Sequence, residues 1–153
     1  KEEIHPETVM LDVGCGSGIL SIIALKLGAK KTVMTDIDPR AVKAAEENMD
    51  VNHLSREQYE THFGNVLEDE EFARSLGEKK YNIVAANILA DVILPLTSIV
   101  DLFLKEDGAF VISGIIETKE QEVLSQLKKY GFFAEKTRRM KEWVSITARR
   151  RRK

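Results

Sequence analysis

The sequence predicts a single α/β domain built on a doubly wound, mostly parallel sheet. Its 153 residues correspond to the length of one domain that can bury a core of its own. Short runs rich in branched apolar residues alternate with longer runs of helical composition along most of the chain, which is typical of β-α-β units. A glycine-rich segment, Gly14–Gly18, joins the first of these short runs to the helix that follows it.

The first half of the chain contains three predicted strands and three predicted helices. Strands are expected over Thr8–Val13, Lys31–Asp36 and Glu60–Phe63, and helices over Ile19–Leu27, Asp38–Asn52 and Leu67–Leu76. Gly28 follows the first helix in a position typical of a C-cap. Asp38 and Pro39 favour the N-cap and the first turn of the second helix.

The second half contains four predicted strands and two predicted helices. Strands are expected over Tyr81–Ala86, Gly108–Ser113, Phe132–Thr137 and Trp143–Arg149, and helices over Leu89–Leu104 and Glu117–Tyr130. Pro95 is expected to bend or split the first of these helices. No helix separates the last two strands, so they predict a hairpin that turns near Arg139–Lys141. One strand of the seven must then run antiparallel.

The composition excludes several classes of protein. Apolar residues make up 43% and charged residues 31%, which argues against intrinsic disorder and coiled coils. No stretch reaches the roughly 20 apolar residues of a membrane helix, and the polar N-terminus predicts no secretory signal. The single cysteine, Cys15, cannot form an internal disulfide, so a cytoplasmic location is expected. The three histidines show no ligand spacing, and no metal site is predicted.

The charge is distributed unevenly along the chain. Five cations, Arg149–Lys153, stand at the C-terminus, and without them the formal net charge of −2 becomes −7. An acidic body argues against general nucleic-acid binding, which needs lysine and arginine on the docking face. The basic tail is interpreted as a solvated terminus, with contact to RNA or an acidic partner as the alternative.

The segment Asp12–Gly18, with the sequence DVGCGSG, carries the strongest local signal. Its glycines allow close approach of a ligand to the backbone, and the following helix offers free N–H groups. Asp36 ends the second predicted strand about 20 residues later, where nucleotide sites place an acid that binds ribose hydroxyls. A capping role is the alternative for Asp36, although Asp38 suits it better. The pattern predicts a nucleotide-like ligand at the carboxyl edge of the sheet.

Two classes of ligand compete for this loop. The dinucleotide fingerprint needs Gly or Ala where the chain has Ile19, which disfavours a nicotinamide-dependent oxidoreductase. Gly14, Gly16 and Gly18, with an acid at Asp12, instead resemble motif I of the class I S-adenosylmethionine-dependent methyltransferases. This resemblance implies a Rossmann-like seven-stranded sheet with an antiparallel final hairpin, and S-adenosylmethionine as the cofactor. A non-catalytic module that keeps the fold is the third alternative.

Further stretches resemble one narrower family, the methyltransferases of large-subunit ribosomal protein eleven. They are Leu11–Leu20, Ala24–Ala29, Asp36–Val42, Val84–Pro95, Ser113–Ile116 and Glu142–Val144. The resemblance covers nearly the whole chain and implies methyl transfer to lysine side chains or an N-terminal amine of a ribosomal protein. It also implies a methyltransferase domain over 1–148 and a basic tail over 149–153. From the resemblance, we expect the N-terminal substrate-binding domain of the family to be absent from this sequence.

The resemblance also implies roles for individual residues. Asp12, Gly14, Gly16 and Gly18 would surround the methionine moiety of the cofactor, with Asp36 at the ribose and Asn65 near the adenine. Asn87 matches the first position of the Asn-Pro-Pro-Tyr motif of amino-methylating members, although Ile88, Leu89 and Ala90 replace the rest.

Asn87 is therefore predicted to hold the acceptor amine and to border the cofactor. Capping of the next helix stays open as a second role for Asn87. For Asn65, the alternative is a simple turn with Gly64.

Two residues with reactive or aromatic side chains are assigned to packing. Cys15 has no histidine near it in the sequence, so a small buried side chain is expected rather than a nucleophile. Trp143 is expected to anchor the last strand in the core rather than to line a substrate cleft.

Overall fold

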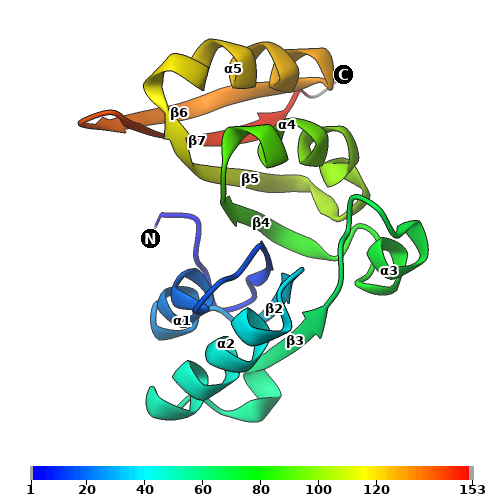
Figure 1. The fold of residues 1–153 in the computed structure, drawn as a ribbon, viewed down its shortest axis with the longest axis vertical. Coiled ribbons are helices and arrows are strands. Elements are labelled where there is room, and N and C mark those ends of the chain that lie inside the picture. The colour runs from blue at the N-terminus through cyan, green and yellow to red at the C-terminus, as the bar shows by residue number, and fades with distance from the viewer. Residues whose placement is uncertain (1, 152–153) are drawn as a thin grey trace.

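The computed structural model describes residues 2–151 and confirms the predicted α/β architecture (Figure 1). The strands are β1 (Val9–Val13), β2 (Lys31–Asp36), β3 (Tyr59–Phe63), β4 (Tyr81–Asn87), β5 (Leu104–Ile116), β6 (Phe132–Met140) and β7 (Trp143–Arg150). The α-helices are α1 (Ile19–Lys26), α2 (Pro39–Val51), α3 (Glu70–Ser75), α4 (Ala90–Ile99) and α5 (Glu120–Lys129). Asp38 caps α2 through its side chain and Pro39 opens it, as predicted.

All seven strands form one sheet with the order β3-β2-β1-β4-β5-β7-β6. Neighbours from β3 to β5 pair in parallel, and β7 runs antiparallel to both β5 and β6. The predicted antiparallel hairpin is thus confirmed. The chain builds outward from β1 through β2 and β3, then continues from β4 on the other side of β1. This reversal of strand order creates a crevice at the carboxyl ends of β1 and β4, where open α/β sheets bind ligands.

Alternating side chains give the sheet two buried faces. Leu11, Val33 and Val84 contribute to the core under α3, α4 and α5. Met10 and Met34, one residue away, contribute to the core under α1 and α2 on the opposite face. Because the central strands are covered on both sides, they read as continuous apolar runs in the sequence.

Helix α4 differs from its prediction. It is not split at Pro95, and it ends at Ile99, before a short 3₁₀ turn and the start of β5 at Leu104. Ile93 and Leu96 are fully buried on either side of the proline, so their packing keeps the helix continuous despite one missing backbone donor.

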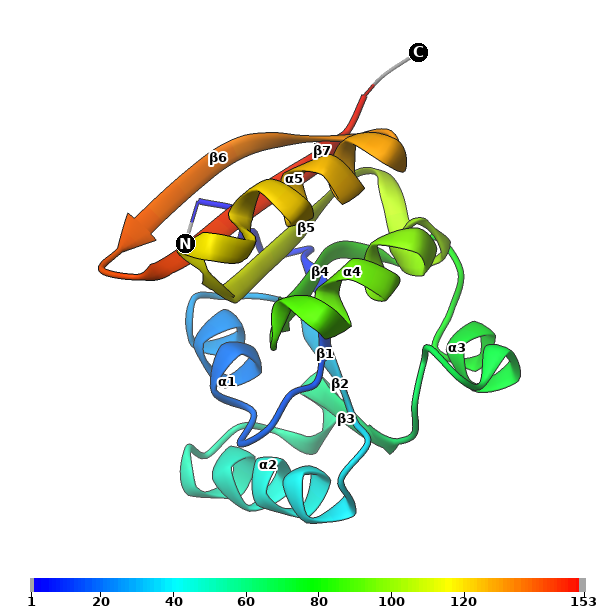
Figure 2. The same cartoon turned by 45° about the horizontal axis from the view of Figure 1, so that its top comes forward.

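The C-terminal hairpin is longer than predicted. Strand β6 continues to Met140, and the turn consists of Lys141 and Glu142, at the end of the region predicted for it. Lys141 has a φ of 55°, the left-handed conformation that two-residue hairpin turns require. The sequence lacks the usual glycine or asparagine signal at this point. The closed end of the hairpin projects from the side of the molecule in both views (Figures 1 and 2).

The last strand extends into the predicted basic tail. Arg149 donates to Glu135 at 3.0 Å and to the carbonyl oxygen of Asp107 at 2.8 Å. Arg150 pairs with Asp101 at 2.8 Å, and its guanidinium lies over the ring of Phe132. These contacts place the first two cations of the 149–153 segment in β7. Arg152 and Lys153 lie outside the described residues.

Candidate functional site

The carboxyl ends of β1 to β4 bring together the residues that the sequence analysis singled out. The glycine loop follows β1, Asp36 ends β2, Asn65 follows β3 and Asn87 ends β4. A cavity of about 260 Å³ lies at the ends of β1, β2 and β3, and Gly14, Asp36 and Asn65 line it. A larger cleft of about 720 Å³ adjoins Asn87 and Trp143.

The glycine loop folds over the end of β2. The backbone N–H groups of Gly14 and Cys15 donate to the carbonyl oxygen of Thr35, at 2.8 and 3.1 Å. Gly14 has a φ of +71°, and a β-carbon added to it would lie 2.6 Å from Cγ2 of Ile88. Both the backbone conformation and the contact therefore require glycine. A β-carbon on Gly16 would meet nothing within 4 Å, so this part of the loop borders open space.

Asp36 connects the loop to the second strand. Its Oδ2 accepts from the backbone N–H of Gly16 and its Oδ1 from that of Asp38, both at 2.9 Å. Asp36 is not the helix cap, because the side chain of Asp38 accepts from Arg40 N at the start of α2. The carboxylate of Asp36 thus fixes the loop and also lines the cavity.

Asp12 lies beneath the loop rather than in the cavity wall. Its side chain is 1% exposed and accepts from the hydroxyl of Ser21 at 2.9 Å and from the backbone of the same residue. Gly18 begins α1 without a side-chain cap, so Asp12 supplies an acceptor to the first turn of that helix. Burial raises the pKa of Asp12 to about 6, against the opposing effect of the Ser21 hydrogen bonds.

This shift gives a testable dependence of stability on pH. Between about pH 4 and pH 6 the folded protein binds more protons at Asp12 than the unfolded chain does. The free energy of unfolding should therefore fall as pH rises through this window, by ~3 kcal/mol for a shift of this size. Denaturant unfolding at pH 4 to 7 should show that Asp12→Asn removes this slope, since the amide can still bond with Ser21.

Asp38→Asn is the matched control for this measurement. The pKa of Asp38 is lowered by its hydrogen bonds to Arg40, so its contribution to stability is lost only as pH falls below about 4. Its unfolding curve should keep the wild-type slope between pH 4 and 6. If the free energy of unfolding changed with pH in the same way in Asp12→Asn and in the wild type, the slope could not be assigned to Asp12.

Asn65 occupies the turn after β3. Its side-chain oxygen accepts from Leu67 N at 3.0 Å, so the predicted alternative of a turn is confirmed. The residue also lines the cavity, beside Val66 and Leu67. The two roles are compatible, because the turn holds Asn65 at the cavity wall.

Asn87 faces the larger cleft from the end of β4. It pairs in register with Ser113 of β5, and a β-carbon on Gly114 would lie 2.9 Å from the Asn87 side-chain oxygen. The absent side chain of Gly114 therefore leaves room for this amide. The capping role that the sequence left open is wrong, because Leu89 is the N-cap of α4 and makes no side-chain hydrogen bond.

The hairpin completes the cleft with residues that the sequence analysis did not assign to a site. Arg138, Met140 and Trp143 line it together with Asn87. The prediction of Trp143 as a core anchor is wrong, since its side chain is 45% exposed. Trp143 opens β7 directly after the turn, where its strand neighbours Ile116 and Met140 are exposed as well. No periodicity in the sequence marks that point.

Cys15 is not an activated nucleophile, and residues 2–151 offer no candidate metal centre. Cys15 is buried, and burial together with Asp12 and Asp36 raises the pKa of its thiol to about 12, as expected for a packing residue. Residues 2–151 contain no group of three or more histidine, cysteine or acidic side chains placed to hold a metal ion. Within the same residues, no helix is long and apolar enough to cross a membrane.

Comparison with known proteins relates this chain to one family. The family model for ribosomal protein L11 methyltransferase (PrmA) matches residues 1–151. A ribosomal protein L11 methyltransferase from Agathobacter rectalis is 48% identical over 92% of this chain and 44% of its own length. One from Lachnoclostridium phytofermentans is 42% identical over 98% of the chain and 49% of its length. The chain thus spans less than half of these curated relatives.

A solved structure shows the same fold. The ribosomal protein L11 methylase from Lactobacillus delbrueckii subsp. bulgaricus superposes with a TM-score of 0.85 at 32% identity. The superposition covers 95% of this chain and 71% of that protein.

Proposed function

Because this chain belongs to the ribosomal protein L11 methyltransferase family, we propose that it transfers a methyl group from S-adenosylmethionine to protein amino groups. The acceptor in this proposal is a lysine side chain or N-terminal amine of a large-subunit ribosomal protein, methylated in the cytoplasm. The observation that carries it is the hydrogen bond between Gly16 N and Asp36. This bond ties the glycine loop to Asp36 at the end of β2. Asp36 lines the smaller cavity, and Asn87 lines the larger cleft.

The cavity suits the adenosine part of the cofactor. Asp36 and Asn65 place oxygen atoms at its edge, while Ile37, Val66 and Ile88 provide apolar walls. A ribose diol can donate to the carboxylate, and a flat base can pack against the apolar side chains. The open space at Gly16 leaves the loop backbone accessible to the amino-acid end. Bound there, the cofactor supplies an electrophilic methyl group.

The same geometry disfavours the nicotinamide alternative. A pyrophosphate binds to free N–H groups of such a loop, and positive charge assists it. Here the N–H group of Gly16 is already bonded to a carboxylate, and residues 14–18 include no lysine or arginine. A carboxylate at this position repels a phosphate.

Asn87 is proposed to hold the acceptor amine. Its side-chain oxygen can accept a hydrogen bond from a neutral amine, whereas an ammonium group has no lone pair to attack with. Withdrawal of the amine from water into the cleft favours the neutral form over the charged one. Trp143 and Met140 add apolar lining to the same cleft from the hairpin. Asp12, Gly14, Gly16 and Gly18 act in the proposal by shaping and presenting the loop.

Calorimetric titration of S-adenosylhomocysteine tests the cofactor assignment directly. The proposal predicts saturable binding in the micromolar range, and no binding of NAD under the same conditions. Methyl transfer is then measured with radiolabelled S-adenosylmethionine and isolated ribosomal proteins as acceptors. Binding of NAD in preference to S-adenosylhomocysteine would overturn the assignment.

Asn87→Ala separates catalysis from cofactor binding. We expect kcat to fall at least tenfold, because the acceptor amine loses its hydrogen-bond partner, while affinity for S-adenosylhomocysteine changes by less than threefold. Asn52→Ala provides the control, since the Asn52 amide donates to the carbonyl oxygen of Asn48 at the end of α2 and does not line the cleft. Unchanged turnover in Asn87→Ala would remove the proposed role.

A further inference from the structure

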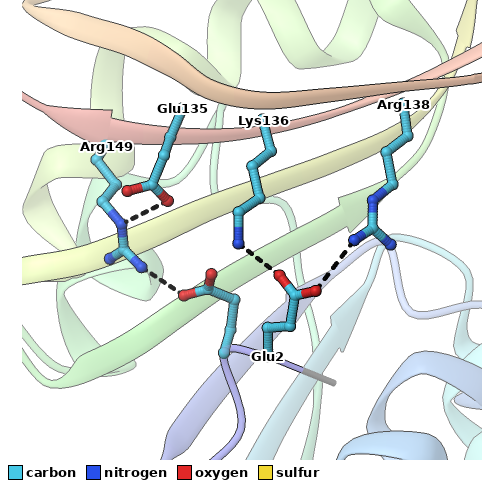
Figure 3. Close-up of polar contacts among 6 residues, drawn as sticks. Glu2, Glu135, Lys136, Arg138 and Arg149 are labelled. Atoms are coloured by element: carbon cyan, nitrogen blue, oxygen red, sulfur yellow. Dashed lines mark hydrogen bonds and ion pairs between the residues drawn. The ribbon is translucent and has the colours of Figure 1, made fainter.

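Two cations of β6 share one acidic partner near the start of the chain. Lys136 donates to one oxygen of Glu2, and Arg138 to the other at 3.4 Å. Figure 3 shows the two basic side chains extending from the strand toward this carboxylate. Residues two apart on a strand point to the same face, so Lys136 and Arg138 form a pair by virtue of their spacing.

This basic pair adjoins the cleft that holds Asn87. A second groove, on the face of the sheet beside α1, is lined by Glu2, Lys136 and Arg138. Arg138 also lines the cleft with Asn87, and Ser113 and Ser145 likewise belong to both. A carboxylate bound by the pair would therefore lie next to the proposed position of the acceptor amine.

Comparison with Arg149 indicates that Glu2 can be displaced from Lys136 and Arg138 by another carboxylate. The guanidinium of Arg149 donates to the carboxylates of Glu3 and Glu135 and to the carbonyl oxygen of Asp107, and the Arg149 side chain is only 28% exposed. Glu2, in contrast, is 61% exposed and the Arg138 side chain is 73% exposed. Exposed ion pairs contribute little to stability, so a carboxylate from another molecule can replace Glu2 at small cost. The basic pair lowers the pKa of Glu2, as expected of a site that favours an anion.

We propose that Lys136 and Arg138 bind an acidic side chain of the methyl-acceptor protein, next to the amine that is methylated. Glu2 occupies the site in the absence of the acceptor and competes with it. This inference rests on the proposed function, and it adds the chemical class of the acceptor sequence. An acidic neighbour would otherwise hold the acceptor amine in its charged form; pairing of that acid with Lys136 and Arg138 offsets this effect.

Two blocked peptides test the proposal by binding, independently of turnover. They are acetyl-Ala-Glu-Lys-Glu-Ala-amide and its counterpart with Gln in place of Glu, titrated at low salt into protein saturated with S-adenosylhomocysteine. The wild type should bind the acidic peptide at least fivefold more tightly. The double variant Lys136→Gln/Arg138→Gln should bind both peptides equally, and Lys136→Arg/Arg138→Lys should keep the preference.

Glu2→Gln gives the sharpest discrimination. If Glu2 competes with the acceptor, this variant should bind the acidic peptide at least threefold more tightly than the wild type. A purely structural ion pair would produce the same or weaker binding. Glu7→Gln is the control, because Glu7 pairs with Lys30 at the amino ends of β1 and β2, away from the cleft.

Several outcomes would overturn the inference. They are equal affinities in the wild type, a preference that survives in the double glutamine variant, and a Glu2→Gln affinity that does not rise. Oligouridylate binding that depends on Lys136 and Arg138, with equal peptide affinities, would assign the pair to RNA instead. A peptide preference without methyl transfer would count against the proposed function alone, and methyl transfer without a preference against this inference alone.

Discussion

Asp36→Asn is expected to weaken S-adenosylhomocysteine binding at least fiftyfold, which corresponds to ~2.3 kcal/mol. The carboxylate accepts from Gly16 N and Asp38 N through different oxygens. An amide offers only one oxygen to these two donors, and its NH₂ group would face the other N–H. The loop would lose its link to β2, and in the proposed site the ribose would lose a charged acceptor, each a loss of about 1.5–3 kcal/mol.

Asp38→Asn makes the same chemical change two residues along the chain. Asn is an equally good N-cap, and Asp38 is not part of the cavity lining. Calorimetry should give this control an affinity within threefold of the wild type. Equal affinities for Asp36→Asn and Asp38→Asn would exclude Asp36 from the cofactor site.

The fold was predictable because local patterns and tertiary packing agree over most of this chain. The buried strand Tyr81–Asn87 has apolar side chains toward both faces, and Asp38-Pro39 marks the start of α2. When local sequence preferences and tertiary packing favour the same structure, the fold can be predicted from the sequence. The expected split at Pro95 did not occur, because the packing of Ile93 and Leu96 keeps α4 continuous there, and α4 ends at Ile99 rather than at Leu104.

The part of the site near the first two strands was also predictable, for a related reason. The loop geometry and the acid of β2 lie on segments whose chemistry is local: glycines that need positive φ, and a carboxylate at a strand end. The hairpin side of the cleft was not predictable. Trp143 and Arg138 line the cleft because β6 and β7 are long and because β7 lies between β5 and β6. Neither the strand lengths nor the strand order leaves a periodic signal in the sequence.

Gly14→Ala is expected to have the largest effect on both folding and binding. A methyl group would lie 2.6 Å from Cγ2 of Ile88, in a residue whose φ is +71°. The backbone strain costs about 1–2 kcal/mol and the overpacking about 1–3 kcal/mol, so the free energy of unfolding should fall by ~3 kcal/mol. Because relief of the contact must move the loop or Ile88, and both border the cavity, affinity for S-adenosylhomocysteine should fall at least hundredfold.

Two further variants separate the contact from the strain. Gly28→Ala introduces alanine at a φ of +99° with nothing within 4 Å of the new β-carbon, so it should destabilise the protein and leave affinity unchanged. Ile88→Ala removes the atom that a β-carbon on residue 14 would meet. If the contact is the cause, the double variant Gly14→Ala/Ile88→Ala should lose less stability than the two single variants together. Strict additivity would attribute the whole effect to backbone strain, and the link between Gly14 and the cavity wall would then fail.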